Sequence, residues 1–158
     1  MQSMEMLHIT DENQLQEVVQ KVLVKLEIAQ KADSPSVLAL SGDLGSGKTT
    51  FTKILASELG IDEVVTSPTF VIMKRYEISG EEKALKIAKQ FSELFHLDAY
   101  RIEDIDEMRV LGFEEILKKP EALICIEWAE RIKELLPPQT VSLQFEREGE
   151  TGRKITFL

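Results

Sequence analysis

Apolar residues follow two different spacings along the chain, and the spacing separates predicted helices from predicted strands. From residue 15 to 26 they recur every three or four positions, which predicts an amphipathic helix capped by Thr10 or Asp11. A second helix is expected over about residues 48–59, with Gly60 as its C-cap. Three short runs are apolar at nearly every position, as in strands buried on both faces. These runs are residues 37–40, 94–97 and 122–126.

The remaining apolar positions predict shorter elements. Residues 103–118 are expected to be helical with an interruption near Gly112, and residues 128–136 to form a short helix that ends at two prolines. Alternating apolar residues late in the chain predict a hairpin of residues 141–145 and 155–157. Further strands are expected at residues 5–9 and 69–77. This order of elements favours an α/β protein with a mainly parallel sheet and an antiparallel edge at the C-terminal hairpin.

Composition and charge narrow the class of protein. The chain has 158 residues, 43% hydrophobic, and we expect residues 1–158 to form one domain with residues 79–92 as a surface insertion. The formal charge of −9 argues against a protein that holds nucleic acid through bulk charge. The single cysteine, Cys125, excludes an intrachain disulfide. Neither a secretory pattern nor an apolar stretch of about 20 residues is readable, so we expect a cytoplasmic protein.

Residues 42–49 read GDLGSGKT and fit the phosphate-binding pattern G-x-x-x-x-G-K-[ST] between a predicted strand and a predicted helix. Glycines let such a loop aim successive N–H groups, and the N-terminus of the next helix, at an anion. Lys48 would reach the β- and γ-phosphates, and the Thr49 hydroxyl would ligate Mg²⁺. The residues expected at the phosphates are Asp43, Leu44, Gly45, Ser46, Gly47, Lys48, Thr49 and Thr50. The motif in this context predicts a P-loop NTPase-like three-layer α/β sandwich.

Two acidic residues, Asp98 and Glu127, directly follow predicted strands. A P-loop site needs a carboxylate at the end of a neighbouring strand to hold or orient the metal ion, and either residue fits. Glu127 has the longer side chain and is also a candidate to orient an attacking water. His96 is either a structural histidine or a residue that fixes Asp98 by a hydrogen bond. Which acid binds Mg²⁺ directly stays open.

Two further patterns concern the nucleotide. Residues 66–70, TSPTF, follow the P-loop helix at the place of a loop that senses the γ-phosphate, although an ordinary turn explains the pattern equally well. The Asn-Lys-x-Asp signature for guanine is absent from the sequence after the P-loop, which favours ATP over GTP.

Taken together, these segments resemble one family. GDLGSGKTTF, TSPTF, HLDAYR, LGFEE and ICIEWAER occur in the order and approximate spacing of the bacterial TsaE family, over residues from about 5 to 158. Its members are the P-loop ATPases of tRNA threonylcarbamoyladenosine biosynthesis. The resemblance implies a slow ATPase that uses ATP and Mg²⁺ and works with the subunits TsaD and TsaB. Those partners are expected to provide most of the contact with tRNA.

The resemblance also implies roles for individual residues. Lys48, Asp98 and Glu127 would be catalytic, and Thr49, Glu127 and Asp98 would serve Mg²⁺. Glu12 and Arg153 would border the base of ATP, and Trp128 would neighbour the site.

Two features depart from the family pattern. The segment between Phe70 and His96 is longer by about the length of a helix, and Ala129 stands where the family often has proline. Neither change removes a reactive group, so they bear on partner contacts. The alternatives are a small-molecule P-loop kinase and a non-catalytic, nucleotide-dependent switch. A kinase would carry an arginine-rich lid, whereas residues 80–92 contain three lysines and no arginine.

Overall fold

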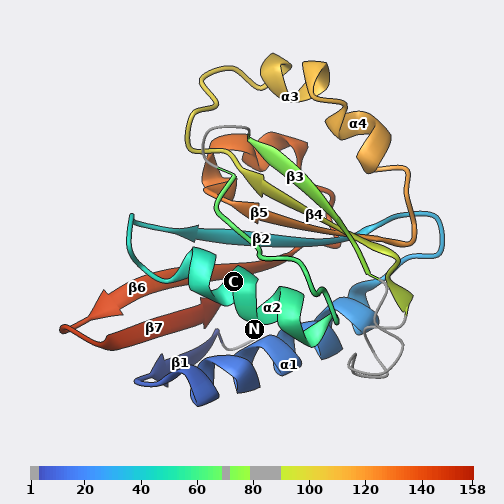
Figure 1. Cartoon of the computed structure of the whole chain (residues 1–158). Coiled ribbons are helices and arrows are strands. Elements are labelled where there is room, and N and C mark those ends of the chain that lie inside the picture. The colour runs from blue at the N-terminus through green and yellow to red at the C-terminus, as the bar shows by residue number, and fades with distance from the viewer. Residues whose placement is uncertain (1–3, 69–71, 79–89) are drawn as a thin grey trace.

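A mixed β-sheet forms the middle layer of the computed structural model, which describes residues 4–68, 72–78 and 90–158 (Figure 1). Within these residues the sheet has seven strands in the order β1-β7-β6-β2-β5-β4-β3. The strands are β1 (Glu5–Ile9), β2 (Ser36–Gly42), β3 (Met73–Glu77), β4 (Glu93–Asp98), β5 (Ala122–Glu127), β6 (Val141–Glu148) and β7 (Gly152–Phe157). Strands β6, β2, β5 and β4 are parallel, whereas β7 is antiparallel to both β6 and β1. The predicted parallel centre and antiparallel C-terminal hairpin are confirmed.

The opposite edge of the sheet holds an antiparallel strand that the sequence did not predict as such. β3 pairs antiparallel with β4, from Met73 opposite Leu97 to Glu77 opposite Glu93. A parallel pair would need a crossover over one face of the sheet, whereas antiparallel neighbours are joined at the same end. The strands at both edges of the sheet, β1 and β3, therefore pair antiparallel with their neighbours. Residues 69–71 of the predicted strand and 79–89 of the predicted insertion lie outside the described residues.

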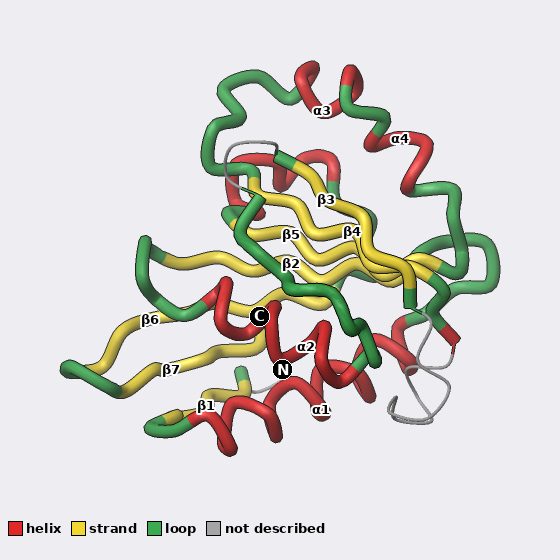
Figure 2. The backbone as a smooth tube through the Cα atoms, viewed as in Figure 1, coloured by secondary structure: helices red, strands yellow, loops and turns green. Residues whose placement is uncertain are grey.

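Helices cover both faces of the sheet and complete three layers (Figure 2). The helices α1 (Glu12–Ala29) and α2 (Lys48–Glu58) pack on one face, in an apolar cluster that includes Leu23, Leu55 and Cys125. The other face carries α3 (Asp106–Val110), α4 (Phe113–Ile116) and the 3-10 helix η2 (Ala129–Leu135). Their cluster includes Met108 and Phe113 packed with strand residues. The predicted three-layer α/β sandwich is confirmed.

Local sequence signals explain where these helices begin and end. Asp11, and not Thr10, caps α1, because its side chain accepts a hydrogen bond of 3.0 Å from the amide of Gln14. The interruption predicted near Gly112 within residues 103–118 is confirmed, and the helical residues are confined to α3 and α4. Gly112, with a φ of 79°, takes a left-handed conformation that ends α3 before α4 begins. No helix in the described segments is long and apolar enough to cross a bilayer.

The parallel strands β6, β2, β5 and β4 all end on the same side of the sheet, at their carboxyl ends. Asp98 at the end of β4 lies opposite Glu127 at the end of β5, and Glu127 in turn lies opposite Leu40 of β2. The glycine-rich loop follows the carboxyl end of β2, on the same side of the sheet. In open α/β sheets, ligands bind in the crevice outside these strand ends. The topology therefore brings the predicted loop and both predicted acids together.

Candidate nucleotide-binding site

The loop of residues 42–49 joins β2 to α2, and two of its glycines are required by geometry. Gly42 has a φ of 139°, and a Cβ atom there would lie 2.3 Å from the carbonyl oxygen of Phe145. Gly47 has a φ of 105°, and its Cβ would lie 3.1 Å from Nε of Arg153. The N–H groups of the first turn of α2 have no acceptor within the helix and carry the positive end of its dipole. The loop is therefore built to receive an anion.

Lys48 is buried in this loop, with 4% of its surface exposed. Its Nζ donates hydrogen bonds to the carbonyl oxygens of Gly42 and Asp43, at 2.5 and 2.9 Å, and lies 4.5 Å from the centre of the Trp128 ring. Burial lowers the pKa of the ammonium group, and the carboxylate of Glu127 opposes that shift. These contacts hold the ammonium group of Lys48 beside the N-terminus of α2. The phosphate oxygens of a nucleotide would compete there with the loop carbonyls for its hydrogen bonds.

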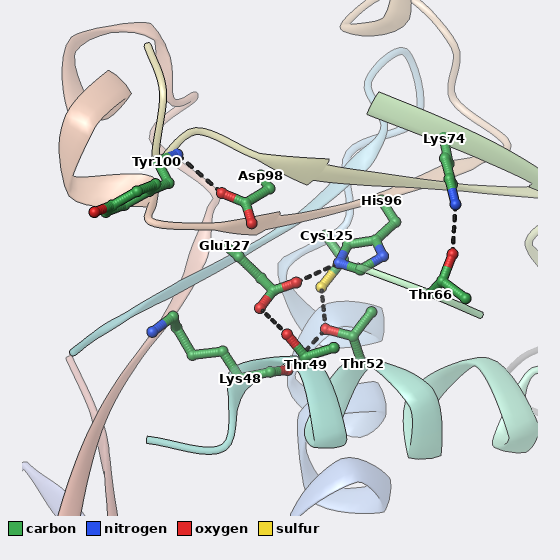
Figure 3. A network of polar contacts seen from close by, with 10 residues as sticks. All are labelled: Lys48, Thr49, Thr52, Thr66, Lys74, His96, Asp98, Tyr100, Cys125 and Glu127. Carbon is green, nitrogen blue, oxygen red and sulfur yellow. Dashed lines mark hydrogen bonds and ion pairs between the residues drawn. The ribbon is translucent and has the colours of Figure 1, made fainter. Parts of the chain in front are cut away.

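Glu127 occupies the centre of the polar network shown in Figure 3. Its Oε1 accepts a hydrogen bond of 2.7 Å from the hydroxyl of Thr49, and its Oε2 lies 2.5 Å from Nε2 of His96. The prediction that His96 fixes Asp98 is therefore wrong. The reason is the strand order, which puts β5 between β2 and β4 and hence Glu127 between Thr49 and His96.

Asp98 is buried beside Glu127 and is oriented separately. Its Oδ1 accepts a hydrogen bond of 2.9 Å from the backbone amide of Tyr100. This local contact orients the carboxylate at the end of the strand. Two carboxylates and the hydroxyl of Thr49 thus meet at one place. Carboxylates, hydroxyl groups and phosphates supply the oxygen ligands that Mg²⁺ prefers, so the residues present fit this ion.

Two adjoining pockets open over the loop. The first, of about 260 Å³, is lined by these predicted residues: Leu44, Gly45, Gly47, Lys48, Thr49, Thr50, Asp98, Glu127 and Arg153. The second, of about 250 Å³, is lined by Glu12 and by residues shared with the first, which are Gly47, Thr50 and Arg153. Asp43 and Ser46 line neither pocket. Both instead contact Lys48, through a backbone carbonyl and a side-chain hydroxyl.

Sequence reasoning missed Tyr100 as a residue of the site. Its ring lies 4.9 Å from that of Trp128 and lines the first pocket, and Arg131 lies 5.4 Å from the ring centre. Trp128 takes a left-handed backbone conformation, with a φ of 56°, that is rare for a bulky residue. The available signal was an aromatic residue shortly after each of the two strand-end acids. Ser67 of the TSPTF segment also lines this pocket.

A strand, a glycine-rich loop with a buried lysine, a helix and two strand-end carboxylates define a P-loop-type nucleotide-binding protein. The sequence model of the family described as threonylcarbamoyl adenosine biosynthesis protein TsaE matches residues 9–155. The chain belongs to the TsaE family.

Individual relatives agree with this assignment. The chain is 41% identical to the tRNA threonylcarbamoyladenosine biosynthesis protein TsaE of Bacillus subtilis, over 87% of this chain and 77% of the relative. It is 34% identical to the protein of the same name from Aquifex aeolicus, over 82% and 81%. The crystal structure of Bacillus subtilis YdiB matches with a TM-score of 0.66 and 31% identity, and the match covers 98% of this chain and 84% of that one.

Proposed function

We propose that this chain binds ATP with Mg²⁺ and hydrolyses it to ADP and phosphate, as a component of the machinery that makes threonylcarbamoyladenosine in tRNA. The observation that carries the proposal is the direct hydrogen bond between Thr49 of the P-loop and Glu127 of β5. It joins a metal-binding hydroxyl to a strand-end carboxylate beside Lys48. The relatives supply the pathway, because they are named for tRNA threonylcarbamoyladenosine biosynthesis.

The residues divide the work of phosphate binding. The N–H groups at the start of α2 and the ammonium of Lys48 hold the β- and γ-phosphates of the substrate. Thr49 uses its one hydrogen on Glu127, so its lone pairs remain free to ligate the metal ion. Asp98 and Glu127 complete the oxygen ligands, directly or through water. Bound Mg²⁺ would neutralise the charge that develops on the phosphates.

The hydrolytic step needs a water molecule oriented toward the γ-phosphate. Glu127 and Asp98 both line the pocket, and a carboxylate there can accept a hydrogen bond from that water and hold it in line. Glu12 and Arg153, which line the adjoining pocket, would border the base side of ATP. We further infer that residues 1–158 act as one domain in the cytoplasm, together with TsaB and TsaD.

Phosphate release from ATP tests the proposal, measured for the purified chain alone and with TsaB and TsaD. We expect slow release alone and faster release in the complex. Glu127→Gln should bind ATP but lose most hydrolysis, on the order of 100-fold, because the neutral amide is a poor partner for metal and water. Glu134→Gln, at an exposed position of η2, is the matched control and should behave as wild type. Absence of hydrolysis in both wild-type samples would contradict the proposal, and retained complex function in Glu127→Gln would favour a non-catalytic switch.

A further inference from the structure

His96 of β4 is the fully buried histidine of the sheet beneath the site, with 0% of its surface exposed. It lines neither of the two pockets over the P-loop. Its side chain lies on the same face of the sheet as α2 and points toward Glu127 (Figure 3). A buried imidazole is costly unless it is hydrogen-bonded, so its partner indicates what it does.

The hydrogen-bond partners of the ring assign its proton. Nε2 lies 2.5 Å from Oε2 of Glu127, whereas Nδ1 has no hydrogen-bond partner among the described residues. An ionised carboxylate only accepts hydrogen bonds, so Nε2 must carry the hydrogen. In the neutral ring, Nδ1 is then an acceptor without a donor, and no buried N–H group of the ring is left without an acceptor. The ring thus has one hydrogen-bond partner in the described part of the chain, and that partner is Glu127.

The consequence for Glu127 is that each carboxylate oxygen has its own donor. Thr49 donates to Oε1 from the P-loop side, and His96 donates to Oε2 from the sheet side. The two donors come from different elements, Thr49 from α2, which packs on the sheet, and His96 from β4, which is the neighbour of β5 within the sheet. Two hydrogen bonds, one to each oxygen, fix the rotation of the carboxylate plane, which one bond leaves free. The plane decides which lone pairs face the metal ion and the water.

We propose that His96 is a positioning residue that orients the carboxylate of Glu127 for its work on Mg²⁺ and water. The inference rests on the proposed ATPase function and extends it to a residue that touches neither nucleotide nor metal. Outer residues that orient a metal ligand typically contribute 10- to 100-fold to metal affinity or activity. His96 should therefore affect metal affinity and turnover while leaving the affinity for nucleotide in the absence of metal unchanged.

A pair of variants tests the role of the Nε2 hydrogen. His96→Leu removes the donor, whereas the side-chain amide of His96→Gln reaches the place of Nε2 and restores it. Two quantities are measured: kcat and KM for ATP in the complex with partners, and the affinity of the protein–ADP complex for Mn²⁺ by electron paramagnetic resonance. We expect about a 10- to 100-fold loss in kcat and in Mn²⁺ affinity for His96→Leu. His96→Gln should recover most of both, and neither variant should alter the affinity for ADP in EDTA.

Phe95→Leu is the matched control for a purely structural effect. Phe95 is the neighbour of His96 on β4, but its side chain packs in the cluster on the other face of the sheet. This variant should lose stability without losing Mn²⁺ affinity. If His96→Leu does not fold, His96→Asn replaces it, because its amide takes the place of Nδ1 and does not reach Glu127. Equal losses for the Gln variant and the donor-free variant, or an equal loss for Phe95→Leu, would overturn the inference.

The two measurements also separate this inference from the proposed function. If the wild-type complex hydrolyses no ATP, the proposed function fails, and Mn²⁺ affinity still decides the role of His96. Weaker Mn²⁺ binding in His96→Leu but not in His96→Gln would then support positioning. Unchanged Mn²⁺ binding in every variant would overturn it, whatever the hydrolysis shows.

Discussion

At the scale of single residues, Lys48 carries a charge in a place where charges are costly. Carbonyl oxygens of the loop and the face of Trp128 replace the water that the ammonium loses on burial. The phosphates of ATP would offer full negative charges in place of these partial ones. The same side chain therefore contacts the loop in this structure and would form a charge-assisted contact with a bound phosphate.

Substitution of Lys48 by alanine should weaken ATP binding. A charge-assisted hydrogen bond contributes about 1.5–3 kcal/mol, which corresponds to a Kd increase of about 10- to 150-fold. Isothermal titration calorimetry measures this change. Lys53→Ala, on an exposed position of the same helix, is the control and should leave the Kd unaltered. An unchanged Kd for Lys48→Ala would contradict the assignment of the site.

The limits of sequence reasoning are also visible at single residues. The roles expected of Lys48 and Thr49 depend on contiguous residues, so the motif spacing was enough to predict where they lie. One of the two alternatives for His96 was a hydrogen bond to Asp98, which is close in sequence, but its partner in the structure is Glu127, 31 residues away. Only the order of strands in the sheet reveals that contact, and local periodicity carries no information about that order.

At the scale of elements, the P-loop depends on the hairpin of β6 and β7. Gly42 approaches the backbone of Phe145, and Gly47 approaches Arg153. The sequence predicted the strands, the helices and the antiparallel hairpin, because each has a local apolar period. It also predicted the break near Gly112 between α3 and α4, but not the direction of β3, which depends on how segments meet.

Gly47→Ala should lower both stability and nucleotide affinity. A non-glycine residue at a φ of 105° costs about 1–3 kcal/mol, and its Cβ also crowds the side chain of Arg153. Gly149→Ala is the matched control, since Gly149 also has a positive φ, of 65°, but its Cβ would meet no atom within 4 Å. Chemical denaturation should show destabilisation in both variants. Only Gly47→Ala should bind ATP more weakly, and an equal affinity in the two would refute the contact.

The edge strand β3 is held to the rest of the sheet by a buried carboxylate. Glu93 accepts hydrogen bonds from Arg75 of β3, at 2.5 Å, and from Lys119, at 3.0 Å. Burial alone would raise the pKa of Glu93, but these two cations outweigh it and the pKa is lowered. Because the folded-state pKa is lowered, the ion pairs stabilise the protein above the ordinary pKa of about 4.5. That stability is lost as the pH falls through the folded-state value.

Glu93→Gln should therefore destabilise the protein in a pH-dependent way. At pH 7 we expect a loss of about 2 kcal/mol in the free energy of unfolding, since two charge-assisted hydrogen bonds are weakened. The difference from wild type should shrink below about pH 4.5, where Glu93 of the unfolded chain is protonated, and should disappear once the pH has fallen through the lowered folded-state pKa. Urea denaturation over a pH series measures both. Glu77→Gln removes an exposed partner of Arg75 and should change stability by less than about 0.5 kcal/mol at every pH.

At the scale of the whole molecule, the chain has a net charge of −9 but contains a candidate anion site in the loop of residues 42–49. Backbone N–H groups, a helix dipole and Lys48 would create that site in a chain whose overall charge is negative. Recognition of a phosphate group and repulsion of a polyphosphate backbone can therefore coexist in one chain.

The isolated chain, without its partners, should bind tRNA weakly at physiological salt. Binding to nucleic acid depends on the release of counterions by a basic surface, which the overall charge opposes. Fluorescence anisotropy with labelled tRNA at 50 and 150 mM salt measures this, with ATP binding as proof that the protein is folded. Tight, salt-dependent tRNA binding by the chain alone would show that a hidden basic surface exists.

The position of β7 in the sheet has a consequence for how the protein is made. β1, the first of the seven described strands to be synthesised, pairs with β7, the last of them. Arg153 of β7 is also a wall of both pockets over the P-loop. A nascent chain that has not reached Gly152 therefore contains the whole glycine-rich motif but an unfinished pocket and an unpaired first strand. The pocket over the glycine-rich loop is therefore completed only when β7 has been made, and a chain released before that point is expected to be recognised by proteases and chaperones before it can be stabilised by a nucleotide.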